Sequence, residues 1–323
     1  MLYVFNICAL ADVQIWSDGY QQAAYHLKVL RMHITMSMPA CSPRDRSSEI
    51  AWYRGIDEGP WDGLATFDRV VHPATWALTV QLAAAAAMTE RVRLWSCIAI
   101  LPIRNAALFA KEAATIDVLS GGRLTLGLGI GAHDVEYLAT GAPLEKRRQR
   151  MDAQVEEMQK IWAEVPPVEE HYPVGPKPVQ SGGIPLIAGV EGPKAIARAA
   201  KWANGVMDGS HAMHFDPERV SEQRQRVVQG WKQSGRTDVP HFSSCLFFSL
   251  GDDPRVQLGE FLVDFLKPYG VDASFIASST SHGADNLRAA VSGARDAGVD
   301  DLLLLPTTAD LNELPRAREA LGI

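Results

Sequence analysis

The chain of 323 residues has 47% hydrophobic and 21% charged residues, as expected for one large globular domain or two small ones. This composition excludes a disordered protein, a collagenous protein and a small disulfide scaffold. The 31 basic and 38 acidic residues give a net charge of -7 and do not gather in runs, so we expect no general binding of nucleic acid.

The cysteines and the longest apolar run indicate in which compartment we expect the protein. The 4 cysteines form no CxxC pair, which favours neither a metal site nor a disulfide framework and fits a reducing cytoplasm. The apolar run at residues 80–88 is far shorter than the roughly 20 residues that cross a bilayer. We therefore expect a soluble, cytoplasmic protein.

Residues 1–31 precede the first predicted strand. They lack the basic region and the cleavage site of a secretory signal. We expect a peripheral N-terminal extension or an overlong gene start, since Met32 stands directly before the strand. Residues 32–323 are expected to form a single domain.

From there on, short β-rich runs alternate with longer amphipathic stretches, as in a chain of βα units. The pattern predicts strands at residues 33–38, 64–67, 92–100, 124–130, 184–188, 205–208, 241–250 and 301–305. It predicts helices at residues 47–58, 74–88, 106–119, 146–163, 193–202, 217–233, 256–265 and 284–297. Eight such units predict a (β/α)₈ TIM barrel, with an open doubly wound sheet as the second alternative.

One segment interrupts this repeat. Residues 165–183 contain five prolines and three glycines, so we expect a long ordered loop. It joins the fourth helix to the fifth strand, which places it at the barrel face opposite the usual active site, unless it wraps around the barrel.

Three glycines alternate along the end of the fourth predicted strand. Gly127, Gly129 and Gly131 share one face, because successive side chains on a strand point to opposite sides. They would leave a wall without side chains against which a flat ring system can lie. The alternative is that these small residues only relieve crowding inside the barrel.

A Gly-Pro turn opens the helix after the fifth predicted strand, in the sequence VEGPK. The free backbone N–H groups of Lys194 and Ala195, together with the Lys194 ammonium, favour a phosphate site at this helix end. Many helices begin in this way for capping alone, which is the alternative.

The same regions carry a family resemblance. The runs LPIRNAALFAKEAATIDVLSGGRLTLGLGIG and IPLIAGVEGPKAIARAAKWANGVMDG resemble the bacterial luciferase-like family of flavin and deazaflavin oxidoreductases, and the similarity extends over residues 32–310. The resemblance implies a barrel that holds reduced FMN or the deazaflavin coenzyme F420 with its ring at the barrel mouth. The contacts that it implies for the cofactor are Gly127, Gly129, Gly131, Glu191, Gly192 and Lys194.

The sequence departs from this family at two positions. Arg69 follows Asp68 where many relatives have a histidine. Ile130 stands where flavin-using luciferases carry an arginine toward the cofactor phosphate. The second departure argues against FMN as the cofactor and does not argue against the deazaflavin.

Asp68, His72 and His133 are the candidates for proton transfer or for orienting the ring and the substrate. Asp68 needs a partner at the barrel mouth, and either Arg69 or a ring hydroxyl can provide one. His72 either turns back into the site or is an ordinary loop histidine. His133 either touches the substrate or only precedes a helix as a cap.

The sequence thus predicts an oxidoreductase in which a reduced flavin-type ring gives a hydride to an unsaturated substrate or electrons to dioxygen for monooxygenation. The expected partners are a small-molecule substrate, a flavin reductase and a second copy of the chain, with neither nucleic acid nor a membrane. The alternative is a catalytically silent barrel that binds a flavin or pairs subunits, since the family histidine is missing.

Overall fold

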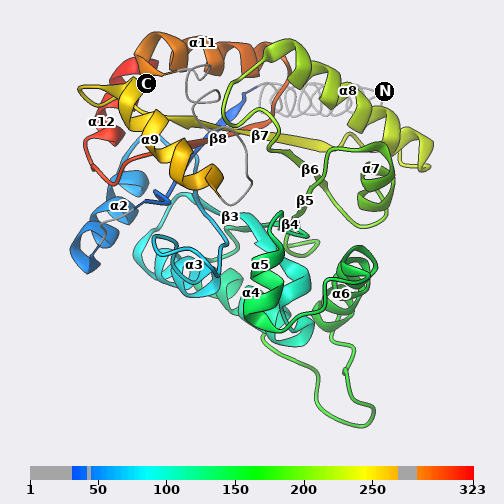
Figure 1. Cartoon of the computed structure of the whole chain (residues 1–323). Helices are drawn as coiled ribbons and strands as arrows, with labels where there is room; N and C mark the ends of the chain where they lie inside the picture. The colour runs from blue at the N-terminus through cyan, green and yellow to red at the C-terminus, as the bar shows by residue number, and fades with distance from the viewer. Residues whose placement is uncertain (1–30, 42–44, 268–281) are drawn as a thin grey trace, which may run out of the picture. The chain divides into compact units, whose positions relative to one another are not determined.

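The computed structural model describes residues 31–41, 45–267 and 282–323, and His33–Ile323 form one compact unit. Eight parallel strands close into a barrel, in which each strand pairs with the next one along the chain and β8 pairs with β1 (Figure 1). The strands are β1 (His33–Ser37), β2 (Gly63–Thr66), β3 (Arg93–Ile100), β4 (Leu124–Gly129), β5 (Leu186–Gly189), β6 (Gly205–Asp208), β7 (His241–Phe248) and β8 (Asp301–Pro306). The predicted TIM barrel is confirmed. Residues 1–30 lie outside the described residues, so the N-terminal extension stays a prediction.

Helices surround this barrel on the outside (Figure 1). They are α2 (Arg46–Glu58), α3 (Leu78–Met88), α4 (Ala106–Leu119), α6 (Arg147–Trp162), α7 (Pro193–Ala199), α8 (Pro217–Gln233), α11 (Gly283–Asp296) and α12 (Glu313–Leu321). Three further elements follow strands β3, β4 and β7, namely η1 (Leu101–Ile103), α5 (Asp134–Thr140) and α9 (Pro254–Leu266).

Side-chain caps explain where several of these helices begin. The Asp45 carboxylate accepts a hydrogen bond from the Ser48 backbone N–H at 2.8 Å, and Asn105 Oδ1 accepts one from the Leu108 N–H at 2.9 Å. Asp216 does the same for α8, where Pro217 is the first helical residue. These caps satisfy backbone donors that have no partner inside the helix.

Eight helices were predicted, and the described residues contain ten α-helices. Both α9 and α11 lie between β7 and β8, and the helix that follows β8 is α12, which the sequence pattern did not predict. The short helix α5 was also missed. Helix α3 begins at Leu78 rather than at residue 74, and α7 ends at Ala199 rather than at residue 202.

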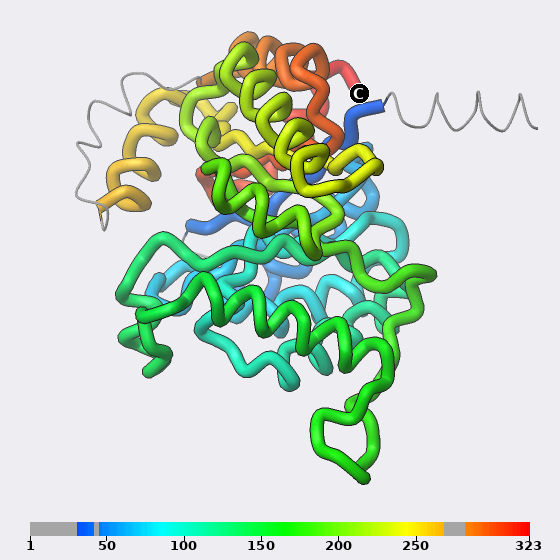
Figure 2. Tube along the Cα trace, turned by 90° about the vertical axis from the view of Figure 1, so that its right-hand side faces the viewer, coloured from blue at the N-terminus to red at the C-terminus, as the bar shows by residue number. Residues whose placement is uncertain are grey.

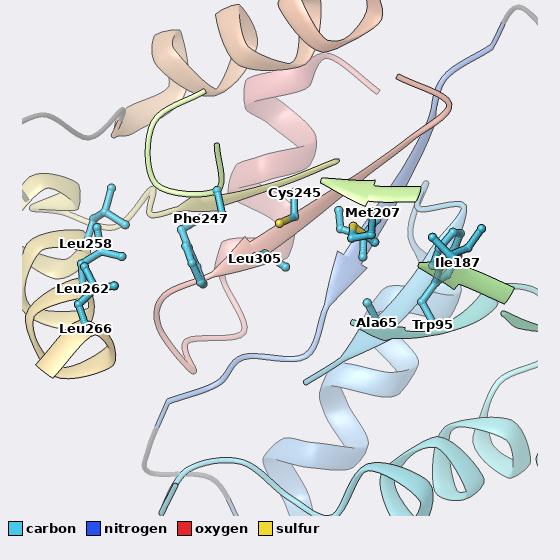
Figure 3. Packing of buried hydrophobic residues seen from close by; sticks show 12 residues of the cluster. Ala65, Trp95, Ile187, Met207, Cys245, Phe247, Leu258, Leu262, Leu266 and Leu305 are labelled. Carbon is cyan, nitrogen blue, oxygen red and sulfur yellow. The ribbon is translucent and has the colours of Figure 1, made fainter. Parts of the chain in front are cut away.

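The barrel interior is filled by side chains that alternate along the strands. Ala65, Trp95, Ile187, Met207 and Cys245 belong to one buried cluster, which Leu303 and Leu305 of β8 complete. Figure 3 shows this cluster continuing past Phe247 to the leucines of α9. All six residues of β8 are buried, as expected for a strand covered on both faces.

The long proline-rich segment between α6 and β5 contains no helix or strand. The buried Asp117 carboxylate of α4 accepts hydrogen bonds from the Val179 N–H at 2.8 Å and from Gln180 Nε2 at 2.7 Å. Part of the segment projects away from the barrel (Figures 1 and 2). It is therefore an ordered loop anchored on α4, as predicted. Within the described ranges, no helix has the length and apolar character needed to cross a membrane.

Candidate active site at the barrel mouth

The end of β3 differs from the other strands. Its register with β4 shifts between Ser96 and Ala99, and the Cys97–Ile98 peptide bond is cis. A bulge of this kind re-aims a side chain, and Ile98 lies across the ends of β4 and β5. A Cβ atom built on Gly129 or on Gly189 would lie 2.2 Å from Ile98 Cδ1. The glycines make room for Ile98, which forms an apolar floor at the barrel mouth.

The predicted glycine wall is therefore covered in part by isoleucine side chains. A Cβ atom on Gly127 would meet the Ser96 carbonyl oxygen at 2.3 Å and Ile98 Cγ2 at 2.6 Å. Gly131 has a φ of 69° and lies beside Ile100. A flat ring at this place would lie against Ile98 rather than against bare glycine backbone.

Asp68, at the end of β2, is buried and has both carboxylate oxygens engaged. Oδ1 lies 2.6 Å from Arg104 Nη2, and Oδ2 accepts a hydrogen bond from the Ile100 N–H at 2.7 Å. The expected partner Arg69 is not used, because it points to a different carboxylate. Asp68 therefore ties the end of β2 to β3 and to the loop that follows β3.

Arg69 pairs with Glu136 of α5, a residue that the sequence analysis did not single out. Arg69 Nε lies 2.9 Å from Glu136 Oε1, and Glu136 Oε2 accepts hydrogen bonds from the N–H groups of Val70 at 2.7 Å and Val71 at 3.0 Å. The Glu136 side chain is fully buried. The pair joins the loop after β2 to α5.

The two candidate histidines lie close to this pair. Burial, and secondly the positive charge of Arg69, lower the pKa of His72 and that of His133. His72 Nδ1 accepts a hydrogen bond from the Ala74 N–H at 3.3 Å. A neutral ring with Nδ1 as acceptor carries its proton on Nε2.

Aromatic side chains from β2, β7 and α9 meet at the same end of the barrel. Phe67 and Phe247 have ring centroids 6.4 Å apart, and Phe247 lies 5.2 Å from Phe261 and 5.3 Å from Phe265. The Arg69 guanidinium lies 5.8 Å from the Phe265 ring centroid. These four phenylalanines form the mouth aromatic cluster, which packs together with the interior cluster that contains Cys245. Burial raises the pKa of the Cys97 thiol to about 12.

A pocket of about 370 Å³ opens beside this cluster. It is bounded by the loops after β1, β2 and β8 and by α9, and its lining includes Cys41, His72, Phe261, Phe265 and Thr307. Its mixed apolar and polar lining is typical of small-molecule sites.

The residues predicted to hold a phosphate lie elsewhere on the mouth. Glu191 and Gly192 line a groove of about 890 Å³ between α7 and α8, together with Arg219 and Arg226. Burial, and secondly the nearby Asp208, raise the pKa of Glu191. The expectation of a free N–H on Ala195 was wrong, because this group donates to the Gly192 carbonyl oxygen at 3.0 Å within the first helical turn. Lys194 is exposed.

Three residues at the mouth were not predicted from the sequence, namely Glu136, Arg104 and Ile98. Each acts through a contact between segments far apart in the sequence, and no spacing rule predicts such a contact. The one local signal for a functional residue was Glu136 in the first turn of α5. A glutamate at this position is equally typical of an ordinary helix start.

These features define the class of protein: a parallel TIM barrel whose C-terminal mouth has an apolar floor, buried ion pairs and a pocket of about 370 Å³. The sequence also matches the family described as luciferase-like monooxygenase over residues 47–322. The chain belongs to this family, which includes oxidoreductases that use FMN or coenzyme F420.

Curated relatives come from Mycobacterium tuberculosis strain H37Rv. One uncharacterised protein is 31% identical over 211 residues, which cover 60% of this chain and 68% of that protein. Another is 30% identical and covers 50% of this chain and 58% of that protein. A protein provisionally named a coenzyme F420-dependent oxidoreductase is 28% identical and covers 56% of this chain and 57% of that protein. The chain thus spans little more than half the length of several relatives.

Solved structures share the fold at low identity. An F420-dependent secondary alcohol dehydrogenase in complex with an F420-acetone adduct has a TM-score of 0.74 and 18% identity, covering 90% of this chain and 99% of that one. The oxygenating constituent of a diketocamphane monooxygenase from Pseudomonas putida, in complex with FMN, has a TM-score of 0.67 and 12% identity, covering 90% and 96%.

Proposed function

We propose that the chain is an oxidoreductase that binds the reduced deazaflavin coenzyme at the barrel mouth and transfers a hydride to a small organic substrate. The observation that carries this proposal is the floor made by Ile98, which lies across glycines of β4 and β5 and offers a flat ring an apolar surface. The alternative is that the protein binds reduced FMN, which reacts with dioxygen. This alternative would require a flavin reductase as partner.

The residues at the mouth fit such a coenzyme. Ile98 would contact the ring, and Gly127, Gly129 and Gly131 would act by admitting Ile98 and Ile100. The groove that begins at Glu191 and Gly192 would hold the phosphate-bearing tail, with Arg219 and Arg226 farther along it and Lys194 exposed nearby. When bound, the deazaflavin ring supplies the hydride, and the protein supplies position and electrostatics.

Ile130 supports the choice of deazaflavin over FMN. It brings no charge to the end of β4, where flavin-using relatives are expected to hold the FMN phosphate. The arginines of this region are engaged elsewhere, since Arg69 pairs with Glu136 and Arg104 pairs with Asp68.

The pocket beside the mouth aromatic cluster is the proposed substrate site. Its phenylalanines exclude water, and His72 presents its Nε2 proton from the loop after β2. We propose that His72 Nε2–H gives its proton to the substrate as the hydride arrives and regains one from solvent water, and that Asp68 acts by fixing the loops after β2 and β3. His133 directly precedes α5 and stays a candidate for contact with the ring or the substrate.

Equilibrium binding tests this function. The purified protein is titrated with reduced and oxidised deazaflavin coenzyme and, in parallel, with reduced and oxidised FMN under anaerobic conditions. We expect tighter binding of the deazaflavin. Preference for reduced FMN would point to oxygen chemistry, and binding without any turnover of ketones, aldehydes or enones would support the silent barrel.

A further inference from the structure

The pocket beside the mouth aromatic cluster has two carboxylates in its wall. Glu260 and Asp264 of α9 both line it, and because they stand four positions apart on the helix, their side chains share one face. Like charges at this spacing repel each other. Neither carboxylate has a hydrogen bond or an ion pair within the part of the chain that the structure describes. A positively charged group in the pocket would therefore be attracted by both.

No basic side chain balances these charges inside the pocket. Its lining contains neither lysine nor arginine among the residues described, and the nearby Arg69 is paired with Glu136. Burial and the Arg69 charge lower the pKa of His72, although Asp264 acts against them, so the His72 ring is neutral at neutral pH. The pocket thus carries a net negative charge, which disfavours a carboxylate, sulfonate or phosphate ligand.

Aromatic rings lie beside the carboxylates. Phe261 and Phe265 line the same pocket, each directly after one of the acidic residues in the sequence, and their stacked rings have centroids 5.5 Å apart. An aromatic face attracts a cation, most strongly where water is excluded. The described residues contain no group of three or more ligands that could hold a metal ion. Rings and carboxylates in one wall fit an organic cation with an apolar body.

A buried hydroxyl group adds a third acceptor to the pocket. Thr307, which follows β8, is only 5% exposed and is part of the lining. Its Oγ1 donates its single proton to the Phe248 carbonyl oxygen at 3.1 Å. Toward a ligand in the pocket, this oxygen can therefore only accept a hydrogen bond. An ammonium group has three donors and no acceptor, so it matches this set of groups.

We propose that the substrate of this site carries a protonated amine, which binds to Glu260 and Asp264 with its apolar part on Phe261 and Phe265. The inference rests on the proposed hydride transfer and names the class of substrate for it. The amine is the group that the pocket recognises, and it takes no part in the reaction. The carbon that accepts the hydride lies apart from the amine in the substrate, on the side of the coenzyme.

Variants of α9 test the role of the two carboxylates. Glu260→Gln with Asp264→Asn keeps the shape of both side chains and removes both charges, and the fold should persist because both residues are exposed. Glu260→Gln with Asp264→Lys instead places a cation in the wall. The matched control is Glu156→Gln with Glu157→Gln, which removes two exposed acidic charges from α6.

The test begins with coenzyme affinity, measured for every variant by fluorescence titration. Complexes with oxidised coenzyme, which cannot give a hydride, are then titrated by calorimetry with primary amines from butylamine to 2-phenylethylamine. Each amine is compared with the alcohol and the carboxylate of matching shape. Failure of the wild type to bind the coenzyme would overturn the proposed function. Failure to prefer amines in a complex that does bind it would overturn only the class of substrate.

We expect the wild type and the α6 control to bind amines about tenfold more tightly than the matching alcohols, and carboxylates most weakly. Glu260→Gln with Asp264→Asn should lose the preference for amines and keep the affinity for alcohols. Glu260→Gln with Asp264→Lys should prefer carboxylates. The assignment is wrong if the neutral α9 variant keeps the preference for amines. It is also wrong if the α6 control loses that preference equally, because the net charge of the protein would then attract the amine.

Discussion

Two buried carboxylates organise the mouth of this barrel. Asp68 binds Arg104 and the Ile100 N–H, and Glu136 binds Arg69 and two further N–H groups. Every carboxylate oxygen in these two side chains therefore has a partner inside the protein. Removing one partner of such a buried pair leaves the other charge uncompensated, which is far more costly than losing an exposed ion pair.

Glu136→Ala should therefore lower the free energy of unfolding by about 3–5 kcal/mol, since it strands the Arg69 charge and two N–H groups. Urea unfolding followed by circular dichroism measures this change. Glu156→Ala, which removes an exposed partner of Lys160 on α6, serves as the control and should have no measurable effect. If Glu136→Ala lowers the free energy of unfolding no more than the control does, the Arg69–Glu136 pair does not hold the loop after β2.

The contact between Ile98 and the glycines is testable by a double-mutant cycle. Gly129→Ala should destabilise the protein by about 1–3 kcal/mol, because the new Cβ lies 2.2 Å from Ile98 Cδ1. Ile98→Val deletes that Cδ1 atom, so the cost of Gly129→Ala should become much smaller in the Ile98→Val background.

Gly127→Ala is the control in the same cycle. Its new Cβ would meet the Ser96 backbone oxygen at 2.3 Å as well as Ile98 Cγ2, so Ile98→Val should not rescue it. Additive effects of Gly129→Ala and Ile98→Val, measured by urea unfolding, would contradict the packing described for Ile98.

Residue types were easier to predict than residue partners. Asp68 and the glycines stood out because their position in a βα repeat is readable from one sequence. Their partners Arg104, Ile98 and Ile100 come from another strand or loop, and the partner of Arg69 comes from a helix 67 positions away. Only the closed barrel brings these groups together.

At the scale of elements, α9 covers the barrel mouth. Its Leu258, Leu262 and Leu266 belong to the interior cluster. The Phe261 ring lies tilted against the Phe247 ring, and the Phe265 ring meets it edge-on. Cys245 precedes Phe247 by two residues on the same face of β7 and lies deeper in the barrel. Helix α9 therefore limits access to the buried Cys245 thiol, whereas Cys97 is partly exposed.

Replacing the aromatic side chains of α9 should expose the Cys245 thiol. Burial raises the pKa of Cys245, so it should react slowly with a thiol reagent at pH 8. In a background with Cys8→Ser, Cys41→Ser and Cys97→Ser, Phe261→Ala with Phe265→Ala should speed the labelling of Cys245. Val263→Ala, on the exposed face of α9, is the control. Equal labelling rates in all three proteins would show that α9 does not cover the mouth.

Elements with strong periodicity were predictable, and irregular ones were not. The eight strands follow from β-rich runs between turns, and β8 is recognisable from its apolar residues alone. Helix α5 has only seven residues, too few for a helical period to show. The bulge in β3 has no signature in the sequence, yet it aims Ile98 at the mouth.

For the whole molecule, the two ends of the barrel have different polar networks. At the N-terminal ends of the strands, the buried Asp301 lies 2.6 Å from Arg93 Nη2 and 2.8 Å from His241 Nε2. Burial by itself raises the pKa of Asp301, but the close His241 ring and the charge of Arg93 outweigh it and hold the pKa below its ordinary value. His33 lies in the same network, and burial lowers its pKa.

Acid should weaken the folded state through its histidines. Because the pKa values of His33, His72 and His133 are lower in the folded protein than in the unfolded chain, the unfolded chain binds protons first as the pH falls. The free energy of unfolding should therefore be constant above about pH 7 and decrease as the pH falls below about 6.5. Urea titrations between pH 8 and pH 5 measure this slope.

Substituting all three histidines by Gln should flatten that slope, whereas His171→Gln, in the exposed loop after α6, should leave it unchanged. If the slope persists in the triple variant, the acid sensitivity lies elsewhere in the molecule.

In the proposed function, a flavin-type ring lies at the C-terminal mouth of the barrel on the Ile98 floor. A crystal structure of the protein with the deazaflavin coenzyme is the decisive experiment. We predict a ring packed on the Ile98 side chain, with its phosphate-bearing tail toward the groove at Glu191 and Gly192. A ring bound away from Ile98, or a coenzyme held only through its tail, would contradict this site.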